Sequence, residues 1–160
     1  MFVRSQQAVD KLYNSVGLVK RLSDGLIKIG PVNVIGLDGI LAWVPGVPLG
    51  AIYSVSASTF IMVQALRARI SPFTFVKTLL ILLADSGLSS VTSLIPFLPA
   101  AADTLFQGHL YASHIVQKEI EKTWYIDGSQ QAAYDRGLHE DNLAALKKMR
   151  GKKRLVYLRP

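Results

Sequence analysis

Two stretches of the chain end in the same proline corner: residues 37–48 read LDGILAWVPGVP, and residues 88–99 read LSSVTSLIPFLP. Each is an apolar run followed by Pro-x-x-Pro. Proline in a helix interior costs about 3 kcal/mol, because it removes a hydrogen bond and clashes with the preceding turn. We therefore predict two helical hairpins that form a weak internal repeat, each turning at its Pro-x-x-Pro corner.

The arms of these hairpins follow from the residues around the corners. We predict helices over about 33–44 and 48–69 in the first hairpin, and over about 72–95 and 99–123 in the second. Ser71 is the expected N-cap of the third helix, and Pro72 suits its first turn. Small residues recur four positions apart on the second helix. This predicted helix-packing face consists of Gly50, Ser54 and Ser58.

The segments outside the hairpins are more polar. Residues 1–30 predict one or two amphipathic helices over about 2–28, which either lie in a membrane interface or pack on the rest of the protein. Residues 124–160 predict a polar helix over about 129–150, capped by Ser129, and then a basic tail. In that tail, residues 155–158 are expected to form a short strand or an apolar anchor. The region between, residues 31–123, is the predicted helical domain.

The distribution of charge favours a membrane protein. Half of the 160 residues are hydrophobic and the net charge is +7, yet residues 31–66 carry one charged side chain and residues 78–117 carry two. Long uncharged stretches between basic segments are typical of membrane proteins. We therefore predict an all-α protein whose hairpins are embedded in an inner or cytoplasmic membrane, with both termini on the cytoplasmic side. A soluble four-helix bundle is the alternative.

The first arm leaves the depth of insertion open. Its roughly 12 residues span about 18 Å at 1.5 Å per residue, less than the roughly 30 Å of a hydrocarbon core. Spanning and re-entrant hairpins both remain consistent with this length.

At these motifs the chain resembles an uncharacterised family, the domain of unknown function four-one-one-two, over about residues 20–123. The family pattern has an apolar run leading to Pro-Gly-Val-Gly-Asp and a second Pro-x-x-Gly-Asp corner. Here Pro45-Gly46-Val47 matches the first corner and Pro96 marks the second. The two Gly-Asp pairs are replaced by Pro48-Leu49 and Pro99-Ala100. The resemblance implies a helical membrane domain and brings no assigned activity.

Polar side chains inside the apolar stretches are the candidate functional residues. An ionisable group at membrane depth is a functional-site candidate by default. Such groups either bond one another between helices, line a wet conduction path, or lie near the membrane interface. The candidate intramembrane polar residues are Asp38, Asp85, Asp103, Gln107 and His114.

No motif of catalysis or metal binding is present. His109 and His114 are five residues apart, which suits a shared metal poorly, and the chain has no cysteine. Phosphate loops and nucleophile motifs are missing from the sequence. We therefore expect no enzymatic activity, no cofactor and no metal.

The basic tail is the last candidate site. It is expected to dock on anionic lipids or on a partner subunit, and nucleic acid is not an expected partner. The predicted function is a non-enzymatic integral membrane protein that serves as an accessory or scaffold subunit of a larger membrane protein complex. The alternative is a small ion- or solute-conducting membrane oligomer. The candidate docking residues are Lys147, Lys148, Arg150, Lys152, Lys153 and Arg154.

Overall fold

The computed structural model describes residues 2–23, 27–29, 32–35, 49–92 and 108–159. Its helices are α1 (Gln6–Ser23), α3 (Leu49–Arg67), α4 (Pro72–Thr92), α6 (Gly108–Lys122), α7 (Gln130–Asp135) and α8 (Leu138–Lys148). Its strands are β1 (Ile27–Ile29), β2 (Val32–Ile35), β3 (Thr123–Ser129) and β4 (Arg154–Arg159).

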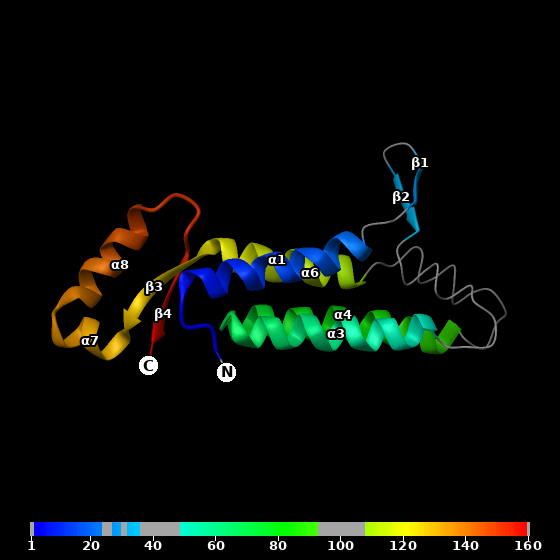
Figure 1. The fold of residues 1–160 in the computed structure, drawn as a ribbon, viewed down its shortest axis with the longest axis horizontal. Coiled ribbons are helices and arrows are strands. Elements are labelled where there is room, and N and C mark those ends of the chain that lie inside the picture. The colour runs from blue at the N-terminus through cyan, green and yellow to red at the C-terminus, as the bar shows by residue number, and fades with distance from the viewer. Residues whose placement is uncertain (1, 24–26, 30–31, 36–48, 93–107, 160) are drawn as a thin grey trace.

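The four longest described helices pack in two layers, with α1 and α6 lying over α3 and α4 (Figure 1). α1 buries Val9, Leu12, Val16 and Val19, which share one face because they are three or four residues apart. α6 contacts α1, α3 and α4, and it contributes Val116 to the core. The amphipathic N-terminal helix is thus confirmed over Gln6–Ser23, and its apolar face packs on the protein.

The C-terminal residues form a small α/β unit. β3 and β4 pair in parallel, and the chain between them passes through α7 and α8. β3 begins at the residue that follows the end of α6. The basic tail is therefore held by backbone pairing from Arg154 onward, and residues 155–158 belong to a strand.

The prediction of one long polar helix over 129–150 is contradicted in the middle of that range, where the structure has two helices. Ser129 caps α7 as predicted, and its hydroxyl accepts a hydrogen bond from the N–H of Ala132 at 3.0 Å. The helix is interrupted at Gly137, whose φ of 69° lies in the left-handed region. Glycine adopts this conformation without the steric penalty of other residues, so the chain turns there and starts α8.

The all-α prediction is contradicted by two two-stranded sheets in the described parts of the chain. β1 and β2 form an antiparallel hairpin where helices over 2–28 and 33–44 were expected. The physical reason lies in local composition: Ile27, Ile29, Val32 and Ile35 are β-branched, and such side chains favour strands. Trp124, Tyr125 and Ile126 of β3 belong to the same class of strand-forming residues.

The prediction of membrane-embedded hairpins is also wrong. Across the described residues, no helix is both long enough and apolar enough to cross a membrane. An uncharged stretch is not necessarily an apolar one, since α3 alone contains Ser54, Ser56, Ser58, Thr59 and Gln64. The membrane location and the orientation of the termini were derived from the same charge pattern, and the finding contradicts them as well. Both Pro-x-x-Pro corners lie outside the described residues.

Candidate functional site

A histidine and an aspartate form a buried polar cluster between α3, α4 and α6. His109 exposes 1% of its surface and Asp85 exposes 6%. Oδ2 of Asp85 lies 3.3 Å from Nδ1 of His109. On the other side of the ring, Nε2 of His109 lies 3.0 Å from the backbone oxygen of Ser54 and 3.0 Å from Oγ of Ser58. One imidazole thus links three helices. We call these four residues the His109 cluster.

The neighbours of the ring decide what the cluster can do. A backbone oxygen only accepts hydrogen bonds, so Nε2 of His109 carries a hydrogen and donates a hydrogen bond to the backbone oxygen of Ser54. A general base needs an unprotonated nitrogen that faces a nucleophile and meets a substrate. Among the described residues, Nε2 of His109 meets a backbone oxygen and two serine hydroxyls inside the bundle, and it is not arranged as such a base, although the residue types are those of a hydrolase triad. The arrangement is suited to holding helices together through satisfied buried polar groups.

Gly108 lets the start of α6 reach Asp85. The N–H of Gly108 donates to Oδ1 of Asp85 over 3.2 Å. A Cβ at position 108 would lie 2.6 Å from Cβ and from Cγ of Asp85, well inside carbon–carbon contact distance. The positive end of the α6 dipole also stabilises a carboxylate at this point. Close approach of α4 and α6 therefore requires glycine here.

Of the five predicted intramembrane polar residues, the structure describes Asp85 and His114, and these two lie in different surroundings. Asp85 is buried beside His109, whereas His114 is exposed, with its Nδ1 3.5 Å from Nζ of Lys20. Ser54 and Ser58, predicted as a packing face, reach α6 through His109. Asp38, Asp103 and Gln107 lie outside the described residues, as do the surroundings of Gly50.

His109 is the buried polar residue that the sequence analysis missed as a neighbour of Asp85. It was considered only as a metal ligand together with His114. Within the described segments, no three His, Asp or Glu side chains come together in a way that could hold a metal ion. A signal was present in Asp85, because a carboxylate inside an apolar helix requires a polar partner. The sequence did not show which residue supplies that partner.

The basic residues of the tail differ in their surroundings. Nζ of Lys152 donates to the backbone oxygens of Glu121 and Thr123 at 2.8 and 2.9 Å, at the end of α6. Arg154 lies 3.9 Å from Glu119. Lys147, Lys148 and Arg150 are exposed at the end of α8 and just after it, and Lys153 is exposed next to β4.

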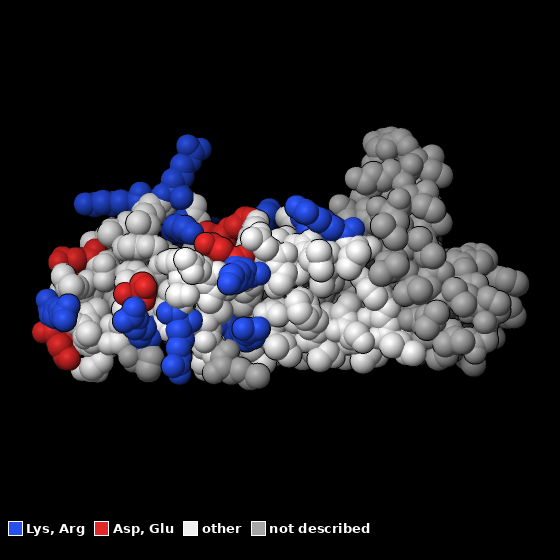
Figure 2. Space-filling view, viewed as in Figure 1, with Lys and Arg blue, Asp and Glu red and all other residues white. Residues whose placement is uncertain are grey.

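The outer sides of α3 and α4 carry large exposed apolar side chains. Figure 2 shows charged side chains gathered over the end formed by β3, β4, α7 and α8, whereas most of the surface over α3 is free of them. Phe73 is the most exposed of these residues, at 80%. We call this surface the α3–α4 apolar face. It consists of Ile52, Val55, Phe60, Val63, Leu66, Phe73, Val76, Leu79, Leu80 and Leu83.

The protein is thus a helical bundle. A buried polar cluster joins its helices internally, and one outer side is apolar. The chain matches the family model for Domain of unknown function (DUF4112) over residues 12–120, and it belongs to this family. The resemblance seen in the sequence is thereby confirmed. No curated protein and no solved structure matches the chain. The match ends within α6, so β3, α7, α8 and β4 follow the family region.

Proposed function

We propose that the chain is a non-enzymatic accessory subunit that docks the α3–α4 apolar face on an apolar helix of a partner protein. The observation that carries the proposal is the exposure of ten large apolar side chains on two adjoining helices. Monomeric proteins rarely expose contiguous apolar patches beyond a few hundred Å².

The size of the face is sufficient for a stable interface. Each of its residues has a whole surface of about 150–200 Å², so the exposed fractions correspond to roughly 900 Å² in all. A standard protein interface covers about 800 Å² on each partner. The face therefore provides the area that one side of a specific complex buries.

The spacing on α4 suits a helix as the partner. Phe73, Val76, Leu80 and Leu83 are three or four residues apart, which is the pattern by which one helix packs along another. A groove of about 360 Å³ follows this stripe. It is lined by Phe73, Val76, Lys77, Leu80, Ile81 and Ala84.

The charge at the groove favours a different protein over a second copy of this chain as the partner. Among the described residues that line the groove, Lys77 is the charged one and none is acidic. Arg67 is the last residue of α3. A second copy would place cations against cations, which weakens association, whereas an apolar helix with acidic flanking residues would be complementary.

The test compares two leucines of equal exposure. Leu80 lies on the face and Leu18 lies on α1, and each exposes 60% of its surface. A photo-reactive amino acid at position 80 would identify the partner in the native cells, and the two purified proteins would then be titrated by calorimetry. We expect a one-to-one complex that Leu80→Asp weakens by about 10- to 100-fold and Leu18→Asp by less than about twofold.

Three results would contradict this proposal. Equal effects of Leu80→Asp and Leu18→Asp would show that the face does not form the interface. A purified chain that dimerises and becomes monomeric on Leu80→Asp would make a second copy the occupant. Binding to protein-free phosphatidylcholine vesicles that Leu80→Asp abolishes, without a protein partner, would make lipid the occupant.

A further inference from the structure

A cavity of about 480 Å³ follows the edge of β4 that does not pair with β3. Five consecutive residues, 153–157, line this cavity, although successive side chains of a strand point to opposite faces. A single space borders both faces of a strand when it lies along the strand's edge. Among the described residues that line the cavity, none belongs to β3, so this edge is the outer one. We call the cavity the β4 edge groove, and its other lining residues are Arg69, Gln130, His139, Leu143 and Leu146.

The outer edge of β4 is open to a further strand over part of its length. In the described parts of the chain, β4 pairs with β3 and with no other strand. An edge strand presents backbone N–H and C=O groups that can pair with another chain. Arg69 closes the end of this edge, since its Nη1 donates to the backbone oxygen of Tyr157 at 2.7 Å. The section from Arg154 to Val156 is therefore the part that an added strand reaches.

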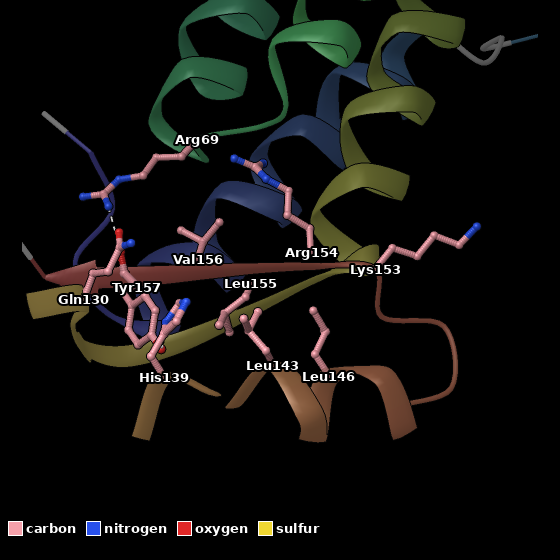
Figure 3. A pocket seen from close by; sticks show the side chains of 10 residues that line it. All are labelled: Arg69, Gln130, His139, Leu143, Leu146, Lys153, Arg154, Leu155, Val156 and Tyr157. Atoms are coloured by element: carbon pink, nitrogen blue, oxygen red, sulfur yellow. Dashed lines mark hydrogen bonds between the residues drawn. The ribbon is translucent and has the colours of Figure 1, made fainter. Parts of the chain in front are cut away.

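The two sides of the β4 edge groove differ in chemistry. Figure 3 shows Arg69 and Arg154 on one side of β4. On the other side, Leu155 projects from β4 toward Leu143 and Leu146 of α8. No acidic side chain is among the described residues that line the groove. One side of the groove is thus basic and the other is apolar.

Both arginines are placed to bind a carboxylate. The guanidinium carbon of Arg69 lies 4.9 Å from the ring centroid of Phe2, so this partly buried side chain is held in position. Arg154 turns its Nη1 toward Glu119, 3.9 Å away, and 31% of the Arg154 side chain remains exposed. A guanidinium carries several N–H donors in a planar fork, so one such group can serve more than one acceptor.

We propose that the β4 edge groove binds an extended segment of another protein in which acidic and apolar residues alternate. The segment adds a strand to β4, and its main-chain hydrogen bonds to the edge supply affinity. Its side chains point alternately to the two faces, as those of β4 do. The acids therefore meet Arg69 and Arg154, and the apolar residues meet Leu143 and Leu146. The alternation also fixes the register, because a slip of one residue would exchange the two faces.

The charge of β4 disfavours a second copy of this chain as the occupant. β4 reads RLVYLR and contains no acidic residue. Two β4 strands paired antiparallel would bring Arg154 of one opposite Arg159 of the other, and like charges directly opposite each other destabilise a sheet. An acidic segment is complementary at the same positions. The groove shares no residue with the α3–α4 apolar face, so the two docking proposals are independent.

The test measures binding of a fluorescent peptide, Glu-Leu-Glu-Leu-Glu-Leu, to the full chain by fluorescence anisotropy. The control peptide has the same composition in block order, Glu-Glu-Glu-Leu-Leu-Leu. We expect the alternating peptide to bind at least about tenfold more tightly than the block peptide. Two N-methylated forms of the alternating peptide each remove the N–H groups from one edge of the peptide strand. We expect one form to bind at least about tenfold more weakly than the other, because one edge of the peptide pairs with β4.

Arg69→Gly tests the basic side of the groove. It is expected to weaken binding of the alternating peptide by about five- to tenfold. The variant is expected to stay folded, because the φ of residue 69 is 51°, a conformation that glycine adopts freely, and a thermal melt checks this. Arg150→Gly is the matched control. It removes the same charge from an exposed site outside the groove and should change binding by less than about twofold.

Hydrogen exchange locates the bound peptide. The backbone N–H groups of β4 are expected to exchange more slowly when the alternating peptide is bound, whereas those of α1 keep their rates. Unchanged exchange in β4 on binding would overturn the proposal.

The binding data offer further ways to overturn it. Equal binding of the alternating and block peptides would show that no strand register is recognised. Equal binding of the two N-methylated forms would show that the backbone of the peptide does not pair with β4. Equal effects of Arg69→Gly and Arg150→Gly would show diffuse charge attraction. Dimerisation of the chain without peptide, with exchange in β4 slowing as the protein concentration rises, would make a second copy the occupant instead.

Discussion

Removing the carboxylate of Asp85 tests whether the His109 cluster stabilises the bundle. In Asp85→Ala, the N–H of Gly108 loses its acceptor at 3.2 Å, and Nδ1 of His109 loses the carboxylate oxygen that lies 3.3 Å away. Each buried polar group left without a partner costs about 1–3 kcal/mol, so the two groups together cost about 2–6 kcal/mol. We expect the free energy of unfolding to fall by this amount, a large part of the roughly 5–15 kcal/mol that keeps a domain folded.

Urea unfolding followed by circular dichroism measures this loss. If only stability changes, the slope of the free energy of unfolding against urea concentration stays the same. Asp127→Ala is the matched control. Oδ1 of Asp127 lies 2.9 Å from Nε of Arg159, but the pair is exposed, so its loss should cost at most about 1 kcal/mol. Adding His109→Leu to Asp85→Ala should recover part of the stability, because the buried Nδ1 that faced the carboxylate is removed with the ring.

Two results would refute the reasoning. If Asp85→Ala and Asp127→Ala lower the free energy of unfolding equally, the buried cluster has no special stabilising role. If the effects of Asp85→Ala and His109→Leu simply add, the two side chains do not act on each other, because residues in one network show coupling of about 0.5–3 kcal/mol.

Three further predictions concern packing, pH and capping. Gly108→Ala would place a Cβ 2.6 Å from Asp85 and should lower the free energy of unfolding by about 1–3 kcal/mol, whereas Gly128→Ala, with its nearest contact at 3.9 Å, should change it by less than about 0.5 kcal/mol in the same urea assay. Burial raises the pKa of Tyr125 from 10.0 to about 12, so its neutral phenol stabilises the fold fully below pH 10, and this contribution is lost as the pH rises from 10 to 12. Phenolate absorbance and urea titrations across that range should show the loss, and Tyr125→Phe should remove this part of the pH dependence. Ser129→Ala should lower the free energy of unfolding by about 1 kcal/mol through loss of the α7 cap, and thermal melts should show Ser129→Asp retaining stability.

Helix boundaries marked by local chemistry could be predicted from the sequence. Ser71 caps α4, since its Oγ accepts from the N–H of Thr74 at 3.3 Å, and α3 lies within one or two residues of its expected range. These signals act within a single turn of chain, so they need no knowledge of the fold. The strands could not be found in the same way. The parallel partner of Tyr125 is Val156, and that pairing forms only when α7 and α8 bring the two strands together.

The membrane prediction failed because charge was used as a measure of apolarity. The serines of α3 add no charge, yet Ser54 and Ser58 are polar groups that bond His109. The candidate site could not be predicted for a different reason: Ser54 and His109 are 55 residues apart and meet only in the folded bundle. Asp85 was identified as unusual from its apolar neighbours, and the geometry alone supplied its partners.

The absence of any residue between α6 and β3 has a consequence for changes in chain length. α6 ends at Lys122, and its carbonyl accepts from the N–H of Lys153, so the C-terminal unit starts directly from the last helical turn. Each residue advances a helix by about 100° and 1.5 Å. One residue inserted into α6 after His109 would therefore swing β3, and everything attached to it, about a quarter of the way around the helix axis. The number of residues in α6 thus sets the direction in which the whole C-terminal unit faces.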